Sequence, residues 1–440
     1  MKIEIDENKK WQHSLTIKMV LLAFLGLFLL IPLQMIILII KERQKTSEDV
    51  KKEIAFQWAG QQNITGPILN IPIRIFPSKK DAEPYVSVFH IMPETLKVKG
   101  EIQTEKRHRS IYQAVVYTAE LNISGNFVVP EFSAGEKSEI LWKDAYYTTG
   151  ISDNRGLKGK IWLKTDSGNL EAIPGLKDPD IFRSGISFPA HLSAKQDSLS
   201  FSLNLNVSGS EGLSFAPIGK STEISLSSKW NSPGFTGNFL PVERKVNDSG
   251  FEAKWLVTNL NRNFPQVWAG SAFNPANDSF GVDFILPVDH YQKSLRSAKY
   301  GILFIALTFL ALIFAEMAIK ERIHVFQYLL VSLGLVLFFS LLNALSEYTG
   351  FNLAYLISAS ATIILITYFL RNLFKKTLTV LLISGLLVFL YLFIFILLTL
   401  NDYAYLAGNI GLFVLLAVTM ILSVRFDLFK NQKEIENSVK

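Results

Sequence analysis

Six long apolar segments constrain the fold of this chain more than any short motif. One lies near the start and five follow one another in the last third, and a polar stretch over residues 41–298 separates them. A helix needs roughly 20 apolar residues to cross a bilayer core, and within lipid it satisfies its own backbone polar groups. The expected spans are 19–40, 301–319, 325–345, 351–370, 378–400 and 404–424. The sequence therefore predicts six transmembrane helices, one N-terminal and five in a C-terminal bundle.

The first segment has a second interpretation, as a cleaved signal peptide. It is longer than a typical signal-peptide core, and it ends in Ile39-Ile40-Lys41 without the small residues of a cleavage site. These features favour an uncleaved signal anchor.

The positions of Lys and Arg predict the orientation of the helices. Basic residues occur in both tails and in the turns near 320–322 and 371–376, whereas the turns at 346–350 and 401–403 have none. The positive-inside rule then places both termini in the cytoplasm and the polar stretch outside it. Five basic residues on the outer side oppose the rule, although long translocated domains tolerate such charges. They are Lys41, Arg43, Lys45, Arg296 and Lys299.

This topology divides the chain into five parts. We expect a cytoplasmic tail over 1–18, a first helix over 19–40, an extracytoplasmic domain over 41–298, helices 2 to 6 over 299–425 and a cytoplasmic tail over 426–440.

The extracytoplasmic domain has mainly the two-residue period of β-strands. Phe201, Leu203, Leu205 and Val207 alternate with polar residues, as in a half-buried strand, and Gly-, Pro-, Asn- and Ser-rich turns separate several such runs. One short helix is expected near 47–62, as an extension of the first span. The chain has no cysteine, so burial and hydrogen bonds alone must stabilise this domain. We predict a mainly-β, sandwich-like domain inserted between helices 1 and 2.

Motifs that carry chemistry are missing from the sequence. The six histidines include no pair at metal-ligand spacing, and the sequence has no Gly-x-Ser-x-Gly elbow. The segment Gly212–Ser221 resembles a phosphate loop, but Ser214 stands where that loop needs glycine. The net charge is +6, and the basic run 106–109 is typical of a solvated turn rather than of a nucleic-acid site. We therefore expect no enzyme activity, no catalytic, metal or cofactor-binding residues, no cofactor and no nucleic-acid partner.

Polar residues in the membrane segments are the remaining site candidates. Glu316 lies near the cytoplasmic end of the second span; it could pair with Lys320 at the headgroup level, or face the bundle interior near His324 or Gln327. Asn343 and Glu347 are four residues apart at the outer end of the third span. They could pack against the external domain, cap the helix end or bind a ligand.

Several stretches resemble the CreD family of inner-membrane proteins. They are GPILNIP from Gly66, RSIY from Arg109, VYTAE from Val116, GISDNRG from Gly150, SKWNSPGFTGNFLP from Ser228, GFEAKW from Gly250, RSAKYG from Arg296 and QYLL from Gln327, with Ser346-Glu347 at a helix end. They span almost the whole chain. Val325 departs from the family pattern, which tends to have proline after the histidine. The resemblance implies a bacterial inner-membrane location, a periplasmic β domain and a role in cell envelope integrity and envelope stress; it carries over no catalytic residue.

Two classes of function follow from these observations. In the first, the protein is a non-enzymatic envelope factor whose periplasmic domain binds a protein, lipid or glycan while the helices contact membrane lipids. In the second, the helix bundle transports or handles a lipid or another amphiphile. The sequence does not determine the oligomeric state.

Overall fold

The chain forms two compact units. The computed structural model describes residues 15–77, 83–130, 138–177, 181–190, 192, 198–286, 290–319, 323–374 and 376–399, and nine positions between 406 and 421. One unit, here called the β unit, spans Ser47–Pro287; the other, the helical unit, combines the chain up to Thr46 with the chain from Val288 onward. A large mainly-β domain therefore lies between the N-terminal and C-terminal helices, as predicted.

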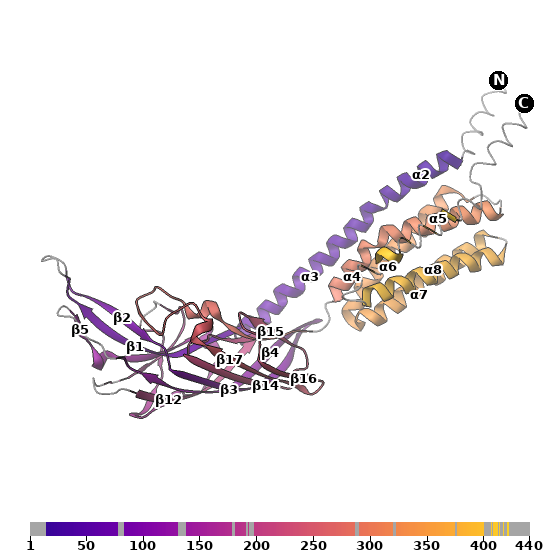
Figure 1. Ribbon diagram of the computed structural model, residues 1–440. Coiled ribbons are helices and arrows are strands. Elements are labelled where there is room, and N and C mark those ends of the chain that lie inside the picture. Colours follow the sequence, from indigo (N-terminus) through magenta and orange to yellow (C-terminus); the bar gives the residue numbers. More distant parts are fainter. Residues whose placement is uncertain are drawn as a thin grey trace, which may run out of the picture. The chain divides into compact units, whose positions relative to one another are not determined.

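Helices make up the helical unit (Figure 1). The helices are α2 (Leu15–Phe28), α3 (Leu30–Trp58), α4 (His290–Lys299), α5 (Gly301–Ile319), α6 (Val325–Thr349), α7 (Phe351–Leu373) and α8 (Thr377–Thr399). All but the short polar α4 are largely apolar. The end of α3, from Ser47 onward, belongs to the β unit. Among the described residues, four helices are long and apolar enough to cross a membrane, or five if the pair α4–α5, bent by 40°, is one span. The predicted span 404–424 lies mostly outside the described residues, so the count of six helices stays a prediction.

Several boundaries differ from those expected, and the β unit begins at Ser47 rather than at residue 41. Residues 290–298, assigned from the sequence to the extracytoplasmic domain, form most of α4 and belong to the helical unit. The helix expected near 47–62 ends at Trp58, and Gln62 already begins a strand. Pro32 explains the short break between α2 and α3, because its ring clashes with the carbonyl of residue 28 and its nitrogen has no hydrogen to donate.

The helical unit buries a cluster of aromatic side chains inside and exposes many large apolar side chains outside. Phe304 and Phe338 lie 4.7 and 4.8 Å from the Tyr391 ring, and the Tyr355 hydroxyl donates to the Tyr391 carbonyl over 2.8 Å. On the outside, Leu381 of α8 is 67% exposed, and many other large apolar side chains are similarly open. Such an apolar exterior is suited to lipid rather than water.

The β unit consists of two sheets. Within the described residues, sheet A has ten strands and sheet B has nine. Along sheet A the order is β10 (Ile173–Pro174), β11 (Gly185–Pro189), β6 (Tyr146–Ile151), β1 (Gln62–Ile75), β13 (Gly212–Phe215), β19 (Phe280–Phe284) and β15 (Pro233–Gly237), with β2 (Tyr85–Ile91), β5 (Ser138–Ile140) and β18 (Val267–Ala269) to the side. Along sheet B it is β16 (Glu243–Asn247), β17 (Gly250–Thr258), β14 (Ser221–Ser228), β3 (Thr95–Arg109), β4 (Tyr112–Val128), β12 (Ser198–Ser210), β8 (Trp162–Thr165) and β9 (Gly168–Glu171), with β7 (Leu157–Lys158) paired to β12.

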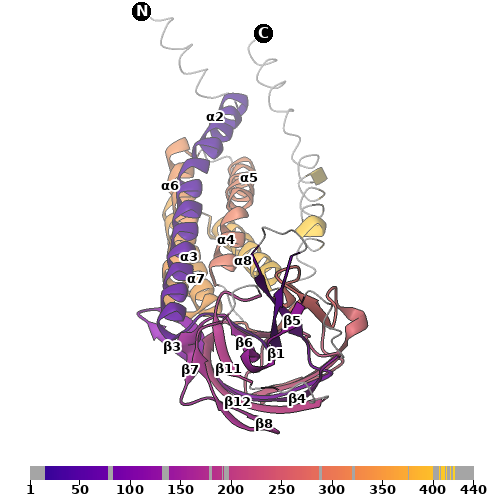
Figure 2. The same ribbon diagram turned by 90° about the vertical axis from the view of Figure 1, so that its left-hand side faces the viewer.

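The two sheets face each other across one apolar core. Phe127 of sheet B lies 5.6 Å from Tyr147 of sheet A, and Trp255 of sheet B lies 5.8 Å from Phe280 of sheet A. Strand β12 has the predicted alternation, with Phe201, Leu203, Leu205 and Val207 buried in this core. The chain passes from sheet B to sheet A at Glu211, a single residue with φ +64° between β12 and β13. The unit is thus a β-sandwich (Figure 2).

Candidate functional site

The candidate site is a groove on the outer face of sheet B, where polar side chains form two rows across the strands. Residues directly opposite on neighbouring strands place their side chains on the same face. The first row, here the charged row, reads Lys245, Glu252, Ser227, Glu101, Glu120, Asn206 and Lys158 across β16, β17, β14, β3, β4, β12 and β7. The second, the amide row, reads Glu243, Lys254, Ser225, Lys99, Asn122 and Asn204.

Both rows line one continuous depression. Its main part has a volume of about 890 Å³ and contains every residue of both rows, together with Lys160 and Arg244. A second part of about 720 Å³ continues over Gln103, Thr104, Lys229 and Asn247 and shares Glu101, Ser227, Lys245 and Glu252 with the first. Each volume is within the range of small-molecule sites, roughly 300 to 1,000 Å³. A groove of this extent could hold several units of a polymer.

Amides, hydroxyls and charges of both signs make up the lining. Asn122 donates to Asn204 over 2.9 Å, so the side-chain amides of neighbouring strands are held in register. Lys254 donates to Glu223, 2.8 Å away beside the amide row, and this hydrogen bond lowers the pKa of Glu223. The main part contains six basic and four acidic side chains. The groove can therefore form hydrogen bonds with neutral polar groups and ion pairs with both anions and cations.

One pair of like charges in the charged row destabilises sheet B locally. Glu101 and Glu120 lie directly opposite each other on β3 and β4, and among the described residues neither makes an ion pair within 4 Å. Like charges at such positions destabilise a sheet. Local conflicts of this kind are typical of functional surfaces, where they are kept for binding.

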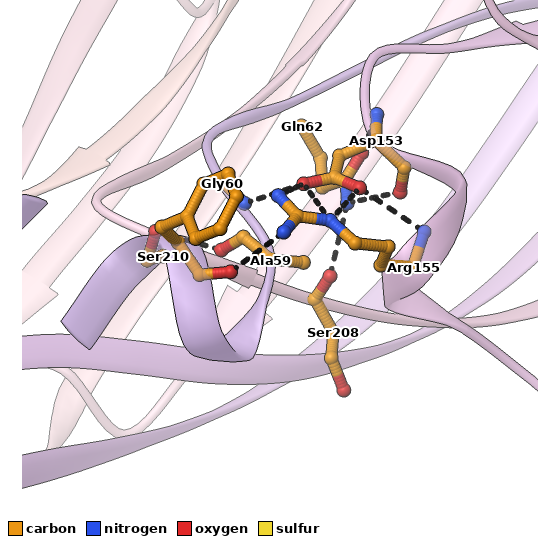
Figure 3. A network of polar contacts seen from close by, with 8 residues as sticks. Ala59, Gly60, Gln62, Asp153, Arg155, Ser208 and Ser210 are labelled. Carbon is orange, nitrogen blue, oxygen red and sulfur yellow. Dashed lines mark hydrogen bonds and ion pairs between the residues drawn. The ribbon is translucent and has the colours of Figure 1, made fainter. Parts of the chain in front are cut away.

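A polar network surrounds Asp153 (Figure 3). It lies directly before β7, the strand that carries Lys158 at one end of the groove. Asp153 accepts hydrogen bonds from the Gly60 amide over 3.1 Å and from Arg155 Nη2 over 2.5 Å. Gln62 donates to the Asp153 carbonyl over 2.9 Å and to the Ser208 carbonyl over 3.1 Å. Asp153 also caps the short helix 154–156, which leads directly into β7. The network, here called the Asp153 latch, thus positions Lys158 next to β12.

The same latch holds the last turn of α3 within the β unit. Arg155 Nη1 donates to the Phe56 carbonyl over 2.9 Å, and Ser210 Oγ donates to the Ala59 carbonyl over 2.9 Å. Trp58 Nε1 donates to the Tyr117 carbonyl of β4 over 3.2 Å. The hydrogen bond from Arg155, opposed by partial burial, sets the pKa of Asp153 at about 2. The aspartate is therefore ionised at neutral pH.

The predicted membrane residues form two separate groups in the helical unit. Glu316 pairs with Lys18 of α2 and accepts from the Tyr328 hydroxyl over 3.2 Å, while Lys18 also donates to the Ile323 carbonyl over 2.7 Å. The expected partner Lys320 lies outside the described residues. His324 and Gln327 form a capping box at the start of α6, with Gln327 accepting from the His324 amide over 2.9 Å.

Asn343 and Glu347 lie near the other end of α6. Glu347 accepts from the Tyr291 hydroxyl of α4 over 3.2 Å, and Asn343 is buried. Glu316 and Glu347 join neighbouring helices, and His324 and Gln327 cap α6. Among the described residues, the buried side-chain oxygen of Asn343 has no hydrogen-bond partner. The role of all five as binding residues stays a prediction.

Sequence reasoning missed the groove. Its lining residues are ordinary polar positions of amphipathic strands, and the alternation in β12 predicts only a half-buried strand in which Asn204 and Asn206 lie on the polar side. The signal that could have found them is the register across the seven strands β16, β17, β14, β3, β4, β12 and β7, several of which are far apart in the sequence. That register is a property of the folded sheet.

Comparisons with known proteins assign the chain to a family. The model of the family described as "Inner membrane protein CreD" matches residues 14–429. The chain is also 32% identical over 423 residues to "Inner membrane protein CreD" of Escherichia coli (strain K12), covering 92% of this chain and 91% of that protein. The apolar helices described above fit a multi-pass protein of the inner membrane. The chain therefore belongs to the CreD family of inner membrane proteins.

Proposed function

We propose that this protein is a non-enzymatic binding protein of the cell envelope, and that the groove on sheet B holds an envelope glycan carrying both carboxylate and ammonium groups. In this proposal the termini are cytoplasmic, the β unit is periplasmic and the helical unit anchors it. A cell-wall glycopeptide has the required chemistry, since it combines sugar hydroxyls, acetamido groups, carboxylates and amines.

The observation that carries this proposal is the order of groups along the two rows. The amide row offers donors and acceptors at Ser225, Asn122 and Asn204. The charged row places Lys245 and Lys158 at its ends and Glu101 with Glu120 between them. Amides and hydroxyls suit sugar hydroxyls and acetamido groups, the end lysines suit carboxylates, and the central glutamates suit an ammonium group.

Lipid binding in this groove has less support. An acyl chain needs an apolar lining, because burying unpaired polar groups against it costs free energy. The side chains that the rows present are polar at every position. The buried residues in the lining, such as Leu121 and Leu226, belong to the apolar core on the other face of the sheet.

Transport by the helix bundle, the second class of function, also has less support. A relay or ligand group needs an available charge, whereas Glu316 is engaged by Lys18 and Tyr328, and Glu347 by Tyr291. These contacts favour a structural role for the two glutamates.

The proposal is tested by sedimentation of the full-length protein in detergent with purified insoluble cell wall. The test variant is Lys99→Glu with Lys245→Glu, because both side chains are exposed groove residues. The matched control is Lys143→Glu with Arg183→Glu, which makes the same charge change on exposed residues outside the groove. We expect the parent and the control to co-sediment equally and the groove variant to bind at least about tenfold more weakly. Reversing Lys245 removes its contact with a carboxylate, and Glu at position 99 adds a negative charge in the amide row, which together change the binding free energy by more than about 1.4 kcal/mol. Equal binding by all three proteins would refute the proposal.

A further inference from the structure

Helix α4 lies at one end of the helical unit. Tyr291 and Ala298 of α4 belong to the same apolar cluster as Ile40 of α3, Leu342 of α6 and Phe351 of α7. These contacts place α4 beside the end of α6 and the start of α7. The group around Glu316 and His324 is near the start of α6, roughly 35 Å away along a helix of 25 residues at about 1.5 Å per residue.

This short helix has one buried face and one basic face. Tyr291, Ser294, Ser297 and Ala298 are buried against the bundle. Lys293, Arg296 and Lys299 follow at intervals of three residues, and the helix contains no acidic residue. Among the described residues, none of these three cations makes an ion pair within 4 Å, and Lys293 Nζ lies 5.6 Å from the centroid of the Phe351 ring.

The basic face coincides with the boundary between polar and apolar sequence. Gly301 begins the apolar helix α5 directly after α4, and the two helices are bent by 40°. On α3 the same boundary falls between Ile40, which is buried in the shared cluster, and the exposed Lys41. A polar helix at such a boundary is typical of the lipid headgroup region, where basic side chains attract anionic lipids.

The predicted orientation makes these charges costly. It places this end of the bundle on the extracytoplasmic side, where Lys and Arg are disfavoured in the residues next to a span. Glu347 of α6 contacts α4 through the Tyr291 hydroxyl, but among the described residues it makes no ion pair with the three cations. Cations at a position that the positive-inside rule disfavours, without an ion-pair partner within 4 Å, call for an anion at the same depth. Phosphate groups of membrane lipids are the anions that the headgroup region supplies.

We propose that Lys293, Arg296 and Lys299 of α4 form a binding site for the phosphate of an anionic membrane lipid. The three side chains surround the headgroup, and the lipid tails lie along the exposed apolar surface of the bundle. The site belongs to the helical unit and is independent of the groove on sheet B.

The test is a native mass spectrometry titration of the full-length protein in detergent, with phosphatidylglycerol as the anionic probe and phosphatidylcholine as the neutral one. We expect the parent to retain phosphatidylglycerol selectively. Each basic residue near an anionic headgroup changes affinity about fivefold, so Lys293→Gln with Arg296→Gln and Lys299→Gln lowers it about 100-fold. Photo-cross-linking with a diazirine-labelled phosphatidylglycerol is expected to label peptides that contain α4.

Three controls separate this site from general effects. The charge-preserving variant Lys293→Arg, Arg296→Lys, Lys299→Arg is expected to bind phosphatidylglycerol as the parent does. That result would show that the weaker binding of the neutralised variant comes from lost charge and not from altered side-chain packing. The variant Lys143→Gln, Lys164→Gln, Arg183→Gln removes three exposed charges from the β unit and stays within twofold of the parent. Inorganic phosphate at the lipid concentration does not displace the lipid. Equal retention of both lipids, unchanged affinity of the neutralised variant, full displacement by phosphate, or cross-links that leave α4 unlabelled would each overturn the proposal.

Discussion

Removing the charge of Asp153 is expected to destabilise the β unit. In Asp153→Asn the side chain keeps one acceptor oxygen but loses the ion pair with Arg155 and weakens the hydrogen bond from the Gly60 amide. A pKa lowered from 3.8 to about 2 corresponds to about 2.5 kcal/mol of stabilisation for a fully buried pair. The Arg155 side chain is 50% exposed, so solvent screening reduces this to about 1–2 kcal/mol.

The assay is thermal unfolding of the full-length protein in detergent, followed by tryptophan fluorescence. Six of the seven tryptophans lie in the β unit, so the signal reports mainly on that unit. For a unit of this size a loss of 1 kcal/mol lowers Tm by about 2–4 °C, which predicts a fall of about 2–8 °C for Asp153→Asn. The matched control Asp248→Asn, at an exposed turn, stays within about 1 °C.

The pH dependence gives a sharper test of the same reasoning. Because folding lowers the pKa of Asp153, its stabilisation is complete above the unfolded value of 3.8 and is lost as the pH falls through about 2. The difference in Tm between parent and Asp153→Asn is therefore constant from pH 7 to pH 5 and shrinks between pH 4 and pH 2. A difference that is absent at pH 7, or that grows toward pH 2, would refute the assigned role of the latch.

Three further predictions concern a charge repulsion, a turn and an ion pair. Glu101→Gln removes the repulsion from Glu120 and raises Tm by about 1–3 °C in the fluorescence assay, with a smaller gain at high salt; a fall in Tm would show that the charge is paired. Glu211→Gly leaves Tm within about 2 °C, whereas Glu211→Val lowers it by more than 3 °C, because a β-branched residue is strained at φ +64°; equal values would contradict the assigned turn. In the helical unit, Lys18→Met removes the ion-pair partner of the partly buried Glu316 carboxylate and so lowers stability. Adding Glu316→Gln removes the unpaired charge and recovers part of that stability. Circular dichroism in detergent should then give a coupling of about 1–3 kcal/mol in the double-mutant cycle, and additive effects would exclude the pair.

The parts of the fold that could be predicted depend on local pattern. The length of the apolar runs predicted the membrane spans that correspond to α5, α6, α7 and α8. The alternation of apolar and polar residues in β12 predicted which of its side chains are buried. Helix α4 could not be recognised, because its mean polarity is that of a loop and only its packing in the bundle buries Tyr291 and Ala298. The Asp153 latch could not be foreseen either, because it joins residues that are about 90 positions apart.

The site residues show the same limit. The sequence suggested Lys320, four positions away, or the bundle interior as the surroundings of Glu316. In the part of the chain that the structure describes, which does not include Lys320, Glu316 pairs with Lys18, 298 positions away. The groove depends on the pairing of β3 with both β4 and β14, and the second of these pairs is parallel. Neither pairing is visible in a single strand. Patterns with a short period predict elements, whereas a binding surface requires the register between them.

The most direct test of the central claim is hydrogen–deuterium exchange of the full-length protein with and without soluble cell-wall glycopeptide fragments. If the groove binds the fragments, peptides that cover the exposed strand β16 and its neighbour β17 exchange more slowly with the fragments than without them. The effect is smaller in β3 and β14, and exchange in sheet A does not change. Unchanged exchange throughout sheet B at saturating fragment concentration, or protection confined to sheet A, would contradict the claim that the groove on sheet B binds an envelope glycan.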